Sequence, residues 1–304
     1  MKVAVISNSE LCIPLLQYLK LNQVQTVFYL GSYQAGADIS SLISFCNVNR
    51  IAVEVEKKSA QLFSWLSAQN PDYGFVFGYK RLIDVERLGE FKKKIFNIHP
   101  GRLPQYRGAS PVFWQLKNGE DTLGITIHFL NERYDAGETV WSKEIGNEPH
   151  FSYGLAELIF SNVLTEGVRH VLSSGIDQLH KQKSVQDERF ASTYKKPGLN
   201  DVLINWQTMP AKNVVDLVRA CNPWNKGAIT VYNGIEVKII DAELAGTETN
   251  ESPGTILEVG NAILVACAGN SAVKINCVNA NGIFVPARFA EKFGFIAKQR
   301  FGPS

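Results

Sequence analysis

Two periodicities alternate along the first third of the chain. Short apolar runs rich in β-branched and aromatic residues predict buried strands, and the intervening stretches, whose apolar residues recur at helical spacing, predict helices. Strands separated by helices form βαβ units, so we expect a mostly parallel, Rossmann-like α/β sheet. The strands are expected at residues 2–6, 25–30, 51–55, 73–78 and 95–99, and the helices at 11–19, 39–47, 59–69 and 85–91.

The pattern changes after residue 108. A helix is expected at 109–117, followed by two strictly alternating strands at 123–129 and 139–145. A long amphipathic helix is expected at 152–173, where apolar residues recur three and four positions apart. These elements complete an α/β domain that we expect to span residues 1–183.

The periodic pattern of apolar residues then ends. The next segment contains charged residues, Pro-Gly and Asn, which predicts a linker at 184–203. An amphipathic helix at 211–220 follows, and after it five short strands separated by turns. Such a series is typical of a small barrel, so we expect an OB-like β-barrel domain over residues 204–304. The strands are expected at residues 228–232, 236–240, 254–257, 262–266 and 273–278.

Composition narrows the class of protein. The chain has 304 residues, of which 45% are hydrophobic and 20% charged, as in ordinary globular proteins of two domains. No run approaches the roughly 18 apolar residues of a membrane span, and residues 1–6 are too short and too soon polar for a signal peptide. Five scattered cysteines form no Cys-x-x-Cys pair, which argues against a zinc site and for a cytoplasmic protein.

Charge gives no sign of a polyanionic partner. The net charge is +2, and residues 206–304 carry nine Lys and Arg against eight Asp and Glu. A dedicated RNA-binding domain carries a clearer basic excess.

Three short polar signals carry the candidate chemistry. Residues 97–108 read NIHPGRLPQYRG, residues 124–128 read GITIH, and residues 135–138 read DAGE. Alternation puts Asn97 and His99 on one face of the predicted strand, at the carboxyl end where α/β sheets bind ligands. Taken singly, each signal has an ordinary explanation. Asn-x-His before Pro-Gly is a common polar turn, Asp135 suits a turn or a helix cap, and His128 suits a packed or solvated position.

Taken jointly, these signals resemble the catalytic core of the folate-dependent formyltransferases, which move a formyl group from 10-formyltetrahydrofolate to an amine. The resemblance covers almost the whole chain. INW at 204–206 and RACNPW at 219–224 are similar to the signature of the small C-terminal barrel of methionyl-tRNA formyltransferases and some nucleotide-sugar formyltransferases.

The resemblance implies a catalytic triad of Asn97, His99 and Asp135. Attack of an amine on a formyl carbonyl puts negative charge on the carbonyl oxygen, and the amine must lose a proton. On this interpretation Asn97 and His99 donate hydrogen bonds to the oxygen, and Asp135 orients His99 and assists the proton transfer.

The resemblance also implies binding residues. The first group lines the folate site: Phe77, Gly78, Tyr79 and Arg81. The second group lies in the loop after the catalytic strand and either contacts the substrate or holds the loop in place: Arg102, Tyr106, Arg107 and Gly108. Arg107 suits either a bound carboxylate or phosphate or hydrogen bonds within the loop. The resemblance implies 10-formyltetrahydrofolate as co-substrate. The chain lacks Gly-x-Gly-x-x-Gly after its first strand and has no cluster of metal-ligating residues in its sequence, so we expect no dinucleotide and no metal.

Two acceptor amines stay open. Length and the barrel favour an initiator tRNA, as in methionyl-tRNA formyltransferases. Residues 30–38, LGSYQAGAD, lack the basic residues and proline with which those enzymes grip tRNA, which favours a nucleotide-linked amino sugar or another small amine. Two lesser alternatives are a formyltetrahydrofolate hydrolase, in which the triad directs water, and a non-catalytic binding module that retains the fold.

Overall fold

The computed structural model describes residues 1–31, 39–58 and 61–302. Internal contacts divide the chain into two units. The first comprises residues 1–111, 124–145 and 157–194, and the second comprises residues 112–123, 146–156 and 195–304. The segment predicted as a linker, 184–203, is therefore divided between the units. Residues 32–38, most of the segment that lacks basic residues and proline, lie outside the described residues.

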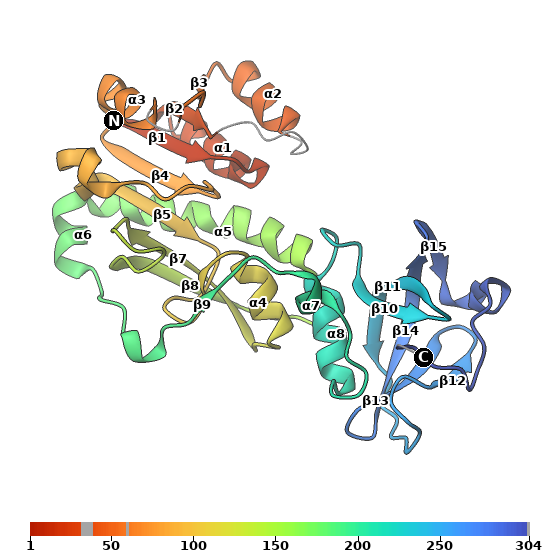
Figure 1. Ribbon diagram of the computed structural model, residues 1–304. Coiled ribbons are helices and arrows are strands. Elements are labelled where there is room, and N and C mark those ends of the chain that lie inside the picture. The colour runs from red at the N-terminus through yellow and green to blue at the C-terminus, as the bar shows by residue number, and fades with distance from the viewer. Residues whose placement is uncertain (32–38, 59–60, 303–304) are drawn as a thin grey trace. The chain divides into compact units, whose positions relative to one another are not determined.

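A seven-stranded sheet forms the centre of the first unit, in the order β3-β2-β1-β4-β5-β7-β8 (Figure 1). The first five of these strands pair in parallel, and β7 runs antiparallel to β5. Parallel strands are covered on both faces, and all five residues of β4 are accordingly buried. The strands are β1 (Lys2–Ser7), β2 (Gln25–Leu30), β3 (Ala52–Val55), β4 (Tyr73–Phe77), β5 (Ile95–His99), β7 (Thr122–Phe129) and β8 (Thr139–Gly146).

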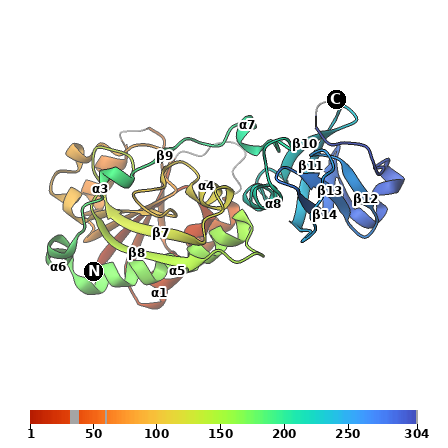
Figure 2. The ribbon, with the colours of Figure 1, turned by 90° about the horizontal axis from the view of Figure 1, so that it is seen from below.

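Helices cover this sheet. Helix α5 lies along β7 and β8 (Figure 2), so close that a side chain at Gly167 would meet Trp141 and Ile127 at 2.5 and 2.6 Å. The helix predicted at 85–91 is a 3-10 helix, interrupted at Gly89, where φ is 55°. The helices of the first unit are η1 (Glu10–Cys12), α1 (Ile13–Leu21), α2 (Ser40–Val48), α3 (Gln61–Gln69), η2 (Val85–Lys94) and most of α5 (Tyr153–Ser174). Helix α4 (Pro111–Lys117) belongs almost entirely to the second unit.

The chain after α5 returns to the first unit. Helix α6 (Ile176–Gln182) and the 3-10 helix η3 (Glu188–Phe190) lead to β9 (Thr193–Tyr194), which pairs in parallel with β6 (Arg107–Gly108). We call residues 184–194 the strap. The strap lies against the loop that follows β5, because Arg107 N–H and Ala109 N–H donate to its carbonyls.

An antiparallel sheet forms the core of the second unit, in the order β10-β11-β14-β13-β12, with β15 also paired to β14. At the two edges of this sheet, Tyr232 of β10 and Thr255 beside β12 form isolated antiparallel bridges with Phe301 and Arg300. The predicted fold class is confirmed, and the closed barrel stays a prediction. The elements are α7 (Leu199–Val202), α8 (Ala211–Ala220), β10 (Ala228–Tyr232), β11 (Ile235–Leu244), β12 (Ile256–Val259), β13 (Ile263–Cys267), β14 (Ser271–Ala280), β15 (Ile283–Pro286) and η4 (Ala287–Phe293).

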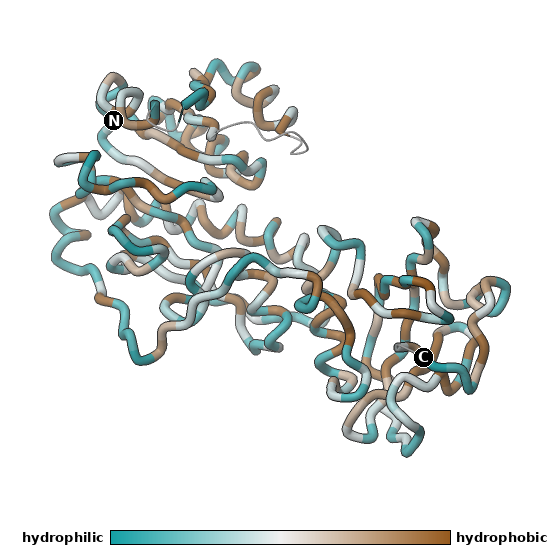
Figure 3. The backbone as a smooth tube through the Cα atoms, viewed as in Figure 1, coloured by the Kyte–Doolittle hydropathy of each residue, from teal (hydrophilic) through white to brown (hydrophobic). Residues whose placement is uncertain are grey.

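Hydropathy along the backbone follows these elements. Apolar stretches coincide with β1 and β5 of the first unit (Figure 3), whose residues are almost all buried. Within the described ranges, we find no helix with the length and apolar character that crossing a bilayer requires.

Candidate active site

Strand register brings four polar side chains together. In the antiparallel pairing of β5 with β7, Asn97 lies opposite His128, and His99 lies opposite Thr126. Because side chains alternate along a strand, these four residues share one face of the sheet. His99 and His128 are 4% and 1% exposed, whereas Asn97 is partly exposed.

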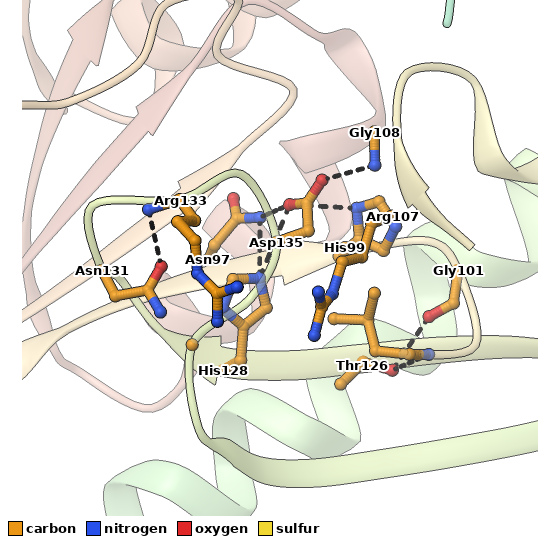
Figure 4. A network of polar contacts seen from close by, with 12 residues as sticks. Asn97, His99, Gly101, Arg107, Gly108, Thr126, His128, Asn131, Arg133 and Asp135 are labelled. Carbon is orange, nitrogen blue, oxygen red and sulfur yellow. Dashed lines mark hydrogen bonds and ion pairs between the residues drawn. The ribbon is translucent and has the colours of Figure 1, made fainter. Parts of the chain in front are cut away.

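Asp135 lies at the centre of this group (Figure 4). Its Oδ1 is 3.0 Å from Asn97 Nδ2, 3.4 Å from His99 Nδ1 and 3.6 Å from His128 Nε2. Its Oδ2 accepts a hydrogen bond of 2.9 Å from the Gly108 N–H. The three residues predicted as a triad therefore converge, and His128 joins them.

Backbone carbonyls fix the protons on both rings. His99 Nε2 is 2.6 Å from the Tyr106 carbonyl oxygen, which can only accept, so Nε2 carries hydrogen and Nδ1 faces Asp135. His128 Nδ1 is 2.8 Å from the Phe129 carbonyl oxygen and is the protonated nitrogen of that ring. His128 Nε2 is then free to accept from Asn97 Nδ2, 3.2 Å away.

The Asn97 amide has one possible orientation. Its Nδ2 donates to Asp135 and to His128, because Oδ1 in that place would oppose a carboxylate oxygen and a ring lone pair. This arrangement differs from the roles predicted from the sequence, in which Asn97 and His99 both donate to the substrate oxygen. In the structure, the amide hydrogens and the His99 Nε2–H already have acceptors within the protein.

Burial and charge set the protonation of the pair. Burial lowers the pKa of His99, and the Asp135 carboxylate opposes this shift only in part, which favours a neutral ring. Burial acts to raise the pKa of Asp135, but His99, His128 and the Gly108 N–H together hold that pKa well below its usual range. At neutral pH the site therefore holds a carboxylate beside an unprotonated His99 Nδ1.

Two glycines allow the loop after β5 to wrap around the His99 ring. A side chain at Gly101 would lie 2.6 Å from His99 Nε2. Gly108 has a φ of 92°, and a Cβ there would lie 2.2 Å from the Tyr194 carbonyl oxygen. The buried Tyr106 ring stacks on Tyr194 with 5.3 Å between the ring centres.

The two arginines of this loop have protein partners. Arg107 is 5% exposed, and its guanidinium donates to Gln186 and Glu188. Of its two predicted roles, this geometry favours fixing the loop over binding a substrate anion. Arg102 lies in the same loop, with its Nη1 3.8 Å from a carboxylate oxygen of Glu144.

The residues predicted to line the folate site lie at the carboxyl end of β4. Phe77 is buried, and Gly78 has a φ of 65°. The Tyr79 hydroxyl donates to Glu56 Oε1 at 2.7 Å, and Arg81 Nε is 3.7 Å from Glu56 Oε2. The almost fully buried Glu56 thus orients two of these residues, while folate contact itself stays a prediction.

Sequence reasoning did not assign a role to His128 or Gln186. A signal for His128 was present, because Gly124, Thr126 and His128 alternate on the strand that pairs with β5. Gln186 lies in a segment without a periodic pattern, so no local pattern indicated a role for it. Across the described ranges, no group of three His, Cys, Asp or Glu side chains is arranged to hold a metal ion.

Comparison with known proteins agrees with the predicted family. The family model for "Formyl transferase" matches residues 1–152, which include the triad, and that for "Formyl transferase, C-terminal domain" matches residues 199–285. The methionyl-tRNA formyltransferase of Clostridioides difficile (strain 630) is 24% identical in an alignment of 269 residues, and the match covers 85% of this chain and 85% of that protein.

Solved structures share the fold. HypX from Aquifex aeolicus matches with a TM-score of 0.66 and 19% identity over 97% of this chain, which spans only 48% of the HypX chain. An N-formyltransferase from Helicobacter canadensis, solved with folinic acid and dTDP-3-aminofucose, matches with a TM-score of 0.71 and 16% identity over 90% of this chain and 98% of its own. Since the first family model alone covers half of the sequence and the second extends the match into the C-terminal unit, the chain belongs to the formyltransferase family and is a formyltransferase.

Proposed function

We propose that the protein transfers the formyl group of 10-formyltetrahydrofolate to an amine, with His99 Nδ1 as the base. The observation that carries the proposal is the geometry of the buried His99 ring, whose Nε2 lies 2.6 Å from the Tyr106 carbonyl oxygen and whose Nδ1 lies 3.4 Å from the Asp135 carboxylate. Burial lowers the pKa of this ring, which favours the neutral form. A base of this kind can take the proton of an attacking amine, and the carboxylate then stabilises the imidazolium that forms.

The transfer needs two bond changes. The amine nitrogen bonds to the formyl carbon, the carbonyl oxygen takes an electron pair, and His99 Nδ1 accepts the proton that the amine loses. Because Asp135 Oδ1 is 3.4 Å from Nδ1, the imidazolium Nδ1–H is then shared between this carboxylate and the charged substrate oxygen. When the bond between the formyl carbon and the folate nitrogen N10 breaks, the same proton passes to N10 and His99 is neutral again.

Asn97 takes an orienting role in this scheme. Its Nδ2 is held by Asp135 and His128, and the residue is partly exposed, so in this scheme its Oδ1 faces the substrate. A carbonyl oxygen accepts hydrogen bonds only, so Oδ1 suits the second N–H of the amine and not the negative substrate oxygen. Holding the amine in line with the formyl carbon converts a bimolecular encounter into an oriented one.

The first acceptor we propose is a methionyl-tRNA. In support, the methionyl-tRNA formyltransferase of C. difficile aligns with 85% of this chain, and the matched residues of the C-terminal family model belong to the second unit. A nucleotide-linked amino sugar is the alternative. In its favour are the absence of Lys and Arg from residues 31–38 and the fold shared with the H. canadensis N-formyltransferase.

A screen of acceptors tests the function. The purified protein is given 10-formyltetrahydrofolate together with charged initiator tRNA, with dTDP-linked amino sugars, or with buffer alone, and release of tetrahydrofolate is followed. We expect tetrahydrofolate to be released only when an acceptor amine is present, together with an equal amount of formylated product. Release with buffer alone would indicate a hydrolase, and no release with any acceptor would contradict formyl transfer.

The pH dependence follows from the base. Because the pKa of His99 lies below its ordinary value of 6.5, the neutral ring predominates at pH 7, and kcat/KM should fall only on the acid side of that value. Asp135 raises the His99 pKa, so the Asp135→Asn variant should keep its residual activity to a still lower pH. The measurement is kcat/KM between pH 4.5 and 8, and an inflection above 6.5 that both proteins share would contradict the role of His99.

A further inference from the structure

We propose that Gln186 and Arg107 are positioning residues for the catalytic carboxylate, and that the strap is thereby a working part of the active site. The inference rests on the proposed function to the extent that formyl transfer needs Asp135 in place. It concerns residues that the triad pattern does not include.

The Gln186 amide is fully used. Gln186 is 8% exposed, and its Nε2 donates to the carbonyl oxygens of Asp135 and Gly137 at 2.9 and 2.7 Å. Its Oε1 accepts from Arg107 Nε and Nη2 at 3.0 and 2.9 Å. An amide offers two donors and two acceptor positions, so no hydrogen-bonding capacity is left for another purpose.

Arg107 fixes the orientation of that amide. Its guanidinium forms a second fork with Glu188, with Nη1 and Nη2 each 3.0 Å from a carboxylate oxygen. Two forks on one buried guanidinium define its plane, and a guanidinium can only donate, so Oε1 of Gln186 must face it. The Gln186 NH2 is therefore directed at the Asp135 turn.

The Asp135 turn needs support of this kind. Asp135 has a φ of 50°, in the left-handed region that costs a residue with a side chain about 1 kcal/mol or more. Residues in such conformations persist where their surroundings determine them from several sides. Here a Cβ at Gly137 would lie 1.7 Å from the Phe129 carbonyl oxygen, so β7 limits the turn on one side while Gln186 holds two of its carbonyls.

Arg107 also connects the turn to the carboxylate itself. The next residue, Gly108, donates its N–H to Asp135 Oδ2 at 2.9 Å. Gln186 thus holds the Asp135 backbone, and the neighbour of Arg107 holds its side chain. A displacement of about 1 Å in a catalytic group costs on the order of 10²-fold in rate, so loss of either contact should appear in kcat.

The test variant is Gln186→Met, which keeps length and neutrality but has no hydrogen bonds to offer the two carbonyls. We expect kcat to fall by about 10²-fold, with the KM values for donor and acceptor nearly unchanged. The matched control is Arg189→Gln, which removes an exposed ion pair with Asp187 in the same strap and should leave turnover unchanged.

A second readout separates positioning from general damage. Asp135 and His128 are the ionisable groups that act on His99, and the first raises its pKa. Retreat of Asp135 should therefore lower the His99 pKa, measured by NMR titration of the ring, and this readout does not depend on activity. If Gln186→Met does not fold, Arg107→Lys, which keeps the charge and loses the fork, is measured in the same way.

Each outcome decides one question. Wild-type kcat in folded Gln186→Met, or lower activity with an unchanged His99 pKa, would overturn the positioning role. Loss of kcat together with a lower His99 pKa supports it. Failure of the wild-type protein to transfer formyl groups would instead contradict the proposed function, and the NMR titration would still decide the positioning role.

Discussion

The Asp135→Asn variant is expected to lose about three orders of magnitude in kcat, within the range that general acid–base catalysis contributes. The asparagine keeps the shape of the side chain and can still accept the Gly108 N–H. It has no charge, however, to stabilise an imidazolium at His99, whose Nδ1 is 3.4 Å from the carboxylate. The measurement is single-turnover formyl transfer at saturating donor and acceptor.

Glu138→Gln is the matched control for this variant. Glu138 lies three residues along the same loop, and its carboxylate pairs with Lys183 at 2.6 Å, away from His99. We expect turnover near that of the wild type. A value for Asp135→Asn within tenfold of the wild type would show that the carboxylate does not support proton transfer.

The Gly108→Ala variant should lose both stability and activity. Its backbone has a φ of 92°, and the new Cβ would lie 2.2 Å from the Tyr194 carbonyl oxygen, so β6 and β9 must separate. We expect a decrease of about 3 kcal/mol in the free energy of unfolding. Because the Gly108 N–H moves away from Asp135, we also expect kcat to decrease by about 10²-fold.

Gly294→Ala separates the cost of backbone strain from the cost of a steric contact. Gly294 has a φ of 86° and a ψ of 12°, but nothing lies within 4 Å of its Cβ position. The free energy of unfolding of this variant should decrease only by the conformational cost, about 1 kcal/mol, and its activity should be unchanged. Chemical denaturation and turnover of the two variants are compared, and equal losses would show that the contact with Tyr194 has no consequence.

Local periodicity predicted most elements of the first unit. The strands at 25–30 and 95–99 have the predicted bounds, because a buried parallel strand is a short apolar run that its own residues define. Two elements were predicted less well. The 3-10 helix at Val85–Lys94 is interrupted at a glycine, and the strand at Ile283–Pro286 of the second unit depends on its pairing with β14.

The convergence of Asn97, His99 and Asp135 followed from a joint motif, while their catalytic role stays a prediction. The proton positions on His99 and His128 depend on the carbonyls of Tyr106 and Phe129, which no side-chain pattern reports. The roles predicted for the Asn97 and His99 donors therefore change in the proposed mechanism.

The strap shows a second limit of sequence reasoning. Gln186 contacts Arg107 across 79 positions and the Asp135 carbonyl across 51. A polar segment without a periodic pattern predicts a linker. The strap makes its hydrogen bonds to distant segments, and such partners leave no local pattern in the sequence.

This separation has a consequence for biosynthesis. The ribosome adds about 5–20 residues per second, so Gln186 follows Asp135 by several seconds. During that interval the nascent chain already holds β5 and β7, while the Asp135 turn lacks the amide that holds its carbonyls. On the proposed positioning role, full activity would await the emergence of the strap from the exit tunnel. A chain truncated before residue 186 would carry Asn97, His99 and Asp135 without the amide that holds the Asp135 turn.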